Sequence, residues 1–304
     1  MQSHSGMFLA PYTVLDFTDE RGEIGPMLLG DLGADVIKVE LREGSRSRAI
    51  APFVDGGEPA DMRSLSFQAF NRNKRSIVLN PDSESDREIL AGLIRTSHFV
   101  FEPAPDGTLS AFGMGYAEVS ALNPQIVFVQ ISPFGSDGPH ADLADSDLVI
   151  AAMGGPVALQ GVVGRAPVRV SIPQVWRHTG VEAASGALAA HHRRLKTGEA
   201  QYVDLAAQNA MTWTMLNAMG AHAIQGADFQ RCGLSYPLAE FDLVYPCADG
   251  WLIALPSSAV LTGCLPEMIE EGIADDKWQD MDWLAYDETM RDLDAHHKIG
   301  RAHV

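Results

Sequence analysis

Short apolar runs alternate with polar, helix-compatible segments through the first two thirds of the chain. The apolar run 12–18 is followed by a glycine-containing turn, a short helix expected over 27–32 that Gly33 ends, and a second apolar run at 36–40. This order is typical of a right-handed parallel crossover between two strands. Further strands are expected over 76–79, 98–101, 126–132 and 201–205, with helices over 86–95 and 117–122. The pattern predicts an α/β fold with a doubly wound, mostly parallel sheet.

The most regular helix is expected over 179–195, where Ala, Leu and Gly dominate. Basic side chains in its last turn suit the helix dipole, and Gly198 ends it. The pair His191 and His192 lacks a third residue at metal-ligand spacing, and we expect the pair on the exposed side of this helix. A second helix is expected over 206–219.

From about residue 236 the sequence pattern changes to that of short strands separated by Gly and Pro turns. The strands are expected over 241–245 and 251–255. We therefore expect a large domain over 1–228 and the start of a smaller second domain over 229–297.

The last residues suggest a chain truncated at its C-terminus. An acidic helical stretch, 275–294, is followed by no terminating core element. The final segment, 298–304, can be encoded by bases that resemble a common sequencing-adapter sequence. We therefore expect 298–304 to be a non-native tail.

Composition and charge exclude several classes of protein. The 304 residues are 46% hydrophobic, which supports a sizeable core, and carry a formal charge of -18. A surface this acidic repels phosphate backbones, so no nucleic-acid partner is expected. The most apolar stretch, 148–163, is interrupted by three glycines and a proline, so no membrane span is expected. Three cysteines without CxxC spacing suggest reduced thiols in a cytoplasmic protein.

No metal and no NAD are expected either. The string Gly22-Glu-Ile-Gly25 is not a dinucleotide fingerprint, and no phosphate-binding GxxxxGK[ST] loop occurs. No His, Cys or carboxylate cluster has the spacing of a metal site.

A set of short strings keeps the order and spacing of a known family from about residue 10 to 215. The strings are 25–26, 29–40, 71–79, 112–116, 123–124, 131–135, 138–139, 147–154, 167–170, 196–198 and 201–205. As an ordered set they resemble family III CoA-transferases, the CaiB/BaiF family, which includes formyl-CoA transferase, carnitine CoA-transferase and α-methylacyl-CoA racemase.

The resemblance implies a Rossmann-like large domain, a smaller domain, and an interlocked dimer in which each chain threads through the other. It also implies CoA transfer between an acyl-CoA thioester and a small carboxylic acid. In this family an Asp attacks the thioester, giving a mixed anhydride and CoA thiolate. The thiolate then returns to form an enzyme thioester, from which the incoming acid takes the CoA.

The expected nucleophile is missing from this chain. The family string Pro-x-x-Asp-x-x-x-Gly aligns without gaps to 173–180, and Trp176 stands at the Asp position. An indole cannot form an anhydride. The racemase subgroup uses a His followed by an Asp, and here the two positions hold Ser146 and Asp147. The catalytic residue is therefore unassigned, and Asp147 is a weak candidate.

The loops that the resemblance places at CoA have also changed. The family string Glu-Asn-Phe-Arg-Pro-Gly reads here as 102–107, with Pro105 in place of a cation, and a basic adenine-side position holds Ala111. The residues that still match, and that we expect at CoA, are Lys74, Arg75, Leu79 and Asn80. Replacement charge is available from Arg42, Arg46 and Arg48.

Three interpretations stay open. In the first, the chain is a CoA-transferase family member that uses another residue as its nucleophile, or a divergent acyl-CoA lyase or isomerase. Alternatively, it is the non-catalytic subunit of a heterodimer with an Asp-bearing paralogue. The third interpretation is a degenerate product without CoA affinity.

Overall fold

A computed structural model describes residues 6–56, 62–226, 228–231, 233, 243–254, 258–272, 274, 280 and 282. The described residues within 1–156 and 170–216 form one unit, and those within 157–169 and 217–304 form a second. The expected tail 298–304 and almost all of the acidic stretch 275–294 lie outside the described residues.

The helices and strands follow one another in an alternating order. They are β1 (Thr13–Asp16), α1 (Ile24–Asp31), β2 (Asp35–Glu40), the 3-10 helix η1 (Arg46–Ala49), α2 (Leu65–Phe70), β3 (Lys74–Val78), α3 (Glu84–Thr96), β4 (Phe99–Pro103), α4 (Thr108–Ala111), α5 (Tyr116–Leu122), β5 (Val127–Ser132), α6 (Asp147–Met153), α7 (Pro156–Leu159), α8 (Val175–Thr197), β6 (Tyr202–Ala206), α9 (Ala207–Trp213), α10 (Leu216–Gln225), β7 (Val244–Cys247), β8 (Gly250–Ile253) and α11 (Ser258–Glu270).

The first unit contains a six-stranded sheet in the order β3-β2-β1-β4-β5-β6, with every neighbouring pair parallel. This confirms the predicted doubly wound α/β fold. The strand order reverses between β1 and β4. In sheets of this kind, ligands bind in the crevice outside the carboxyl ends of the strands at such a reversal.

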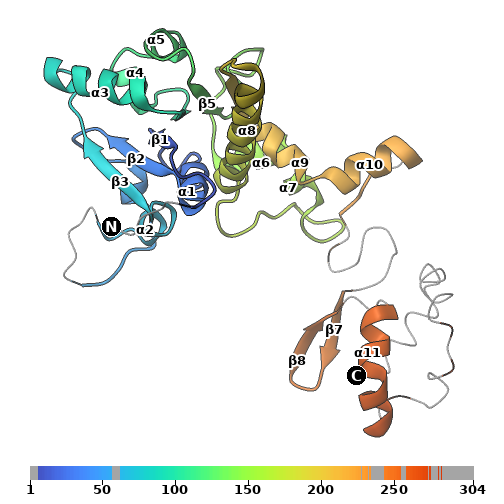
Figure 1. Ribbon diagram of the computed structural model, residues 1–304. Helices are drawn as coiled ribbons and strands as arrows, with labels where there is room; N and C mark the ends of the chain where they lie inside the picture. Colours follow the sequence, from blue (N-terminus) through green and yellow to red (C-terminus); the bar gives the residue numbers. More distant parts are fainter. Residues whose placement is uncertain are drawn as a thin grey trace. The chain divides into compact units, whose positions relative to one another are not determined.

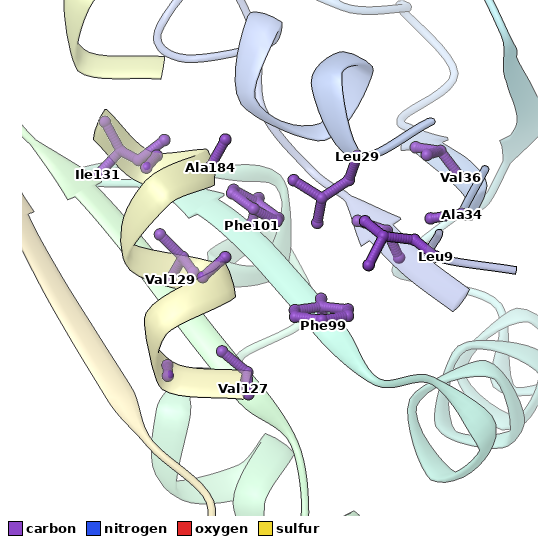
Figure 2. Close-up of a cluster of buried hydrophobic side chains, with 14 residues drawn as sticks. Leu9, Leu29, Ala34, Val36, Phe99, Phe101, Val127, Val129, Ile131 and Ala184 are labelled. Carbon is purple, nitrogen blue, oxygen red and sulfur yellow. The ribbon is translucent and has the colours of Figure 1, made fainter. Parts of the chain in front are cut away.

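Helices cover both faces of this sheet, with α1 and α8 on one and α3, α4 and α5 on the other (Figure 1). Successive strand residues point to opposite faces, so both faces of the parallel sheet are apolar. Figure 2 shows the α1/α8 face, where Phe101 of β4 lies between Leu29 of α1 and Ala184 of α8. On the opposite face, Val100 and Phe128 pack with the helices α3 to α5.

Two glycines let α1 and α8 approach closely. A Cβ added at Gly25 would lie 2.8 Å from the carbonyl oxygen of Gly180, and one added at Gly180 would overlap the Ile24 side chain. Gly25 directly follows Ile24 in α1, and Gly180 lies about one turn after Trp176 in α8. Any side chain here would separate the two helices.

Several predicted boundaries differ from the structure. The helix expected over 206–219 is two helices, α9 and α10. Between them the backbone turns through three-residue hydrogen bonds, from the Thr214 N–H to the Met211 carbonyl at 3.1 Å and from the Met215 N–H to the Thr212 carbonyl at 2.9 Å. The strands expected over 241–245 and 251–255 overlap the antiparallel pair β7 and β8 in the second unit, and residues 241, 242 and 255 lie outside the described residues. The helix expected from residue 27 begins at Ile24, and the helix expected from residue 86 begins at Glu84, where the Ser83 side chain accepts from the Asp86 N–H.

The expectation that both histidines of α8 are exposed is wrong for His191. Its side chain is buried against the rings of Tyr12 and Phe99, and its Nδ1 lies 2.7 Å from an Arg194 nitrogen, whereas His192 is exposed. Burial, together with the Arg194 charge, lowers the pKa of His191 to about 4. The ring is therefore neutral in the folded protein at neutral pH.

His191 is expected to make the fold acid-sensitive. Its pKa is about 4 in the folded chain and 6.5 for an ordinary histidine. The unfolded state therefore binds more protons in this window, and stability falls as the pH drops from 6.5 toward 4. The free energy of unfolding is measured in urea at pH 6.5 and at pH 4. We expect its fall between these pH values to be about 1–3 kcal/mol smaller in His191→Gln than in the wild type. His192→Gln is the matched control, and an equal effect of both variants would contradict the assignment.

Candidate functional site

A cavity of about 330 Å³ lies in the first unit, beside the carboxyl end of β1. Its walls are mostly apolar and come from the β1–α1 loop, the segment after η1, helix α2 and the starts of α6 and α8. The lining residues are Glu20, Glu23, Ile24, Ile50, Ala51, Pro52, Ser66, Phe70, Asp147, Ile172, Pro173, Trp176 and Arg177. The volume suits a small organic group.

Trp176 and Asp147 both line this cavity, which is the larger of two described here, so the structure brings these two sequence-predicted positions together. Trp176 is half-buried and packs on the α1/α8 core. Asp147 begins α6, and its Oδ1 accepts from the backbone N–H groups of Gln174 and Val175, both at 2.9 Å. One oxygen of Asp147 therefore holds the start of α8, which positions Trp176.

Two further carboxylates line the same cavity. Glu23 is buried, and its Oε2 accepts from Asn71 at 2.8 Å. Glu20 pairs through Oε1 with Arg46 at 3.2 Å, while its Oε2 is buried without a hydrogen-bond partner among the described residues. Burial, reinforced by the charge of Asp19, raises the pKa of Glu20.

A buried ionic cluster links the strands next to the cavity. Asp16, at the end of β1, is fully buried, and its Oδ2 lies 2.7 Å from Nζ of Lys74 and 3.5 Å from Nζ of Lys38. Lys74 also donates to the Glu23 carbonyl at 2.8 Å and to Asn71 at 2.9 Å. The cluster therefore holds the backbone that carries Glu23.

A smaller cavity, about 130 Å³, lies at the ends of β1, β2 and β4. Its lining residues are Thr18, Asp19, Val39, Glu40, Leu41, Gly44, Ser45, Arg46, Asp106, Gly107 and Thr108. Burial acts to raise the pKa of both Asp19 and Glu40. Hydrogen bonds from Arg21 to Asp19 and from Arg48 to Glu40 outweigh burial, so both pKa values are lowered. Both carboxylates are therefore ionised.

Arg46 stands between the two cavities. Its guanidinium lies 3.2 Å from Glu20, which lines the larger cavity, and 4.0 Å from Asp19, which lines the smaller one. Its side chain is 70% exposed, so it can reach an anionic ligand. Arg48, by contrast, pairs with Glu40 at 2.7 Å and stacks on Phe67.

The four residues expected at CoA lie in different environments. Lys74 is buried and uses its three N–H donors within the protein, and Leu79 belongs to the core. Arg75 pairs with Asp35 on the surface. Asn80 organises the turn before α3, where its N–H donates to Asp86 at 2.8 Å. None of the four lines either cavity described above.

Glu20 was not singled out from the sequence. The available signal was its position, two residues beyond a strand expected over 12–18. In a doubly wound sheet that place is where ligands bind.

No group of three or more His, Cys, Asp or Glu among the described residues could hold a metal ion. No described helix is long and apolar enough to cross a bilayer.

Comparison with known proteins gives one consistent family. The model of CoA-transferase family III matches residues 9–289. The chain is 32% identical over 228 residues to succinate–glutarate CoA-transferase of Agrobacterium fabrum, a match covering 74% of this chain and 57% of that protein. It is 30% identical over 285 residues to subunit BbsE of succinyl-CoA:(R)-benzylsuccinate CoA-transferase of Thauera aromatica, covering 90% and 68%.

Solved structures agree with these sequence matches. A CAIB/BAIF family protein from Brucella suis superposes with a TM-score of 0.74 and 27% identity, over 98% of this chain and 78% of that one. The chain spans 57% to 68% of the length of the two curated relatives described above.

Proposed function

Because the chain belongs to CoA-transferase family III, we propose that it moves CoA from an acyl-CoA thioester to a carboxylic acid. The larger cavity carries this proposal. It lies beside the strand-order reversal and joins apolar walls, suited to an acyl group, with three carboxylates. The acyl end of the thioester lies in this cavity, and the CoA phosphates extend toward Arg46.

The reaction needs a carboxylate that can attack a thioester and leave again. An acyl–carboxylate anhydride is reactive enough to pass the acyl group in both directions. Trp176, at the position the family resemblance gives to Asp, supplies only an apolar wall. Its ring limits how large an acyl group the cavity accepts.

A second function is favoured by one relative. The Thauera aromatica protein is named as a subunit of its CoA-transferase. On this alternative, the present chain pairs with an Asp-bearing paralogue in an interlocked heterodimer and contributes architecture rather than the nucleophile. The first proposal pairs it with a second copy of itself, and both place it in the cytoplasm.

Mass spectrometry of thioester products distinguishes these functions. The chain is incubated with succinyl-CoA, which the name of the Thauera aromatica enzyme gives as its donor, and a panel of small carboxylic acids. We expect new acyl-CoA thioesters from the purified chain alone. Products that need an added Asp-bearing paralogue would support the subunit function. Absence of products under both conditions would contradict CoA transfer.

A further inference from the structure

The larger cavity contains one carboxylate whose environment differs from the other two. Oδ1 of Asp147 accepts from two backbone N–H groups at the start of α8, so moving this carboxylate would release the start of that helix. Glu23 is committed to Asn71 and sits beside two buried ammonium groups. Glu20 alone among the three keeps an oxygen that is buried and has no partner among the described residues.

We propose that Glu20 is the catalytic nucleophile of this chain, replacing the carboxylate lost at Trp176. The inference rests on the proposed function. Glu20 reaches the cavity from the β1–α1 loop rather than from α8, so the attacking carboxylate enters from a different wall. Its partner Arg46 holds the other oxygen in place, which orients the carboxylate.

The chemical step balances without any further reactant. A Glu20 carboxylate oxygen attacks the thioester carbonyl carbon, the carbon–sulfur bond breaks, and CoA leaves as a thiolate. The thiolate then attacks the Glu20 carbonyl carbon of the anhydride, releasing the original acid as a carboxylate. This leaves a thioester between Glu20 and CoA. The incoming carboxylate attacks its carbonyl carbon, the carbon–sulfur bond breaks, and a second anhydride and CoA thiolate form. The thiolate then attacks the carbonyl carbon of the incoming acid in this anhydride, which gives the new acyl-CoA and frees the Glu20 carboxylate. In each step an anionic carboxylate or thiolate attacks and another anionic carboxylate or thiolate leaves. No proton therefore has to be supplied or removed.

The surroundings of Glu20 suit this role. Oε2 of Glu20 is buried in the free chain, so attack requires the side chain, which is 24% exposed, to turn this oxygen toward the cavity. No hydrogen bond to Oε2 has to break for that turn, and a poorly solvated carboxylate is more basic than one in water. Burial and the neighbouring Asp19 charge raise the pKa of Glu20, while Arg46 opposes that rise. The Arg46 charge also lies where it can stabilise the departing thiolate or a phosphate of CoA.

Hydroxylamine trapping followed by peptide mapping tests this role in the unmodified protein. The chain is incubated with succinyl-CoA and treated with hydroxylamine, which converts an activated carboxyl group to a hydroxamate. We expect the hydroxamate on Glu20. Modification of Asp147 or Glu23 instead, or of no residue in a chain that transfers CoA, would overturn the assignment.

Variants give an independent readout. Glu20→Gln keeps the shape of the side chain and is expected to lower CoA transfer by roughly 10³-fold or more. The matched control is Glu88→Gln, an exposed glutamate on α3, which should keep wild-type activity. A Glu20→Gln variant that transfers CoA at the wild-type rate refutes the role of Glu20 but leaves the proposed function standing. A wild-type chain that transfers no CoA refutes both.

Discussion

Adding Trp176→Asp to the Glu20→Gln variant is expected to restore CoA transfer by about 10²–10³-fold over the single variant. Both positions line the same cavity, so a carboxylate supplied from α8 faces the same substrate as one supplied from the β1–α1 loop. The hydroxylamine-sensitive adduct should move from residue 20 to residue 176. Peptide mapping and the thioester assay, applied to the same samples, measure both effects.

The control for this rescue is the double variant Glu20→Gln, Trp176→Asn. Asparagine removes the indole and opens the cavity as much as aspartate does, but it cannot form an anhydride. We expect this variant to stay inactive. Equal recovery in both double variants would mean that cavity size, rather than a carboxylate, limits the reaction.

Replacing Asp16 by asparagine is expected to lower the free energy of unfolding by about 3–5 kcal/mol. The carboxylate is fully buried between Lys38 and Lys74, and its other oxygen accepts from the Thr18 backbone and hydroxyl at 2.9 and 2.6 Å. Without it, two buried ammonium groups lose their shared counter-charge. Urea unfolding at neutral pH measures the loss.

Two further measurements separate this effect from a general charge effect. Asp31→Asn breaks a partly exposed pair with Arg72 and should cost at most about 1 kcal/mol. Although burial opposes it, Lys38 and Lys74 lower the pKa of Asp16 below 3.8. The Asp16 contribution is therefore complete above that pH and is lost as the pH falls through the lowered folded value. A difference between wild type and Asp16→Asn that persists unchanged into strong acid would contradict the ionic origin.

The fold can be predicted from local patterns of apolar and polar residues in the sequence. Short apolar runs with helices between them predict parallel strands, and the strands β1 to β6 are all parallel to their neighbours. The burial of His191 could have been predicted from its position in the helical repeat of α8. The buried positions of α8 include Ala183, Ala187, Ala190 and Arg194, and a spacing of three and four residues places His191 on that same face.

The site was harder to predict than the fold. Family resemblance directed attention to Trp176 and Asp147, and both do line the cavity. It also suggested Lys74 at CoA, because a lysine in sequence shows its charge but not its partners. The structure shows that Asp16, Glu23 and Asn71 use all three of its donors. Glu20 stands out only when burial and hydrogen bonding are known.

The most direct measurement is a calorimetric titration of CoA and acetyl-CoA into the purified chain, with circular dichroism to show that it is folded. We expect both ligands to bind in the micromolar range and to bind more weakly to Arg46→Gln, because Arg46 is an exposed cation between the two cavities. Absence of binding heat from a folded chain would contradict the claim that this protein handles acyl-CoA.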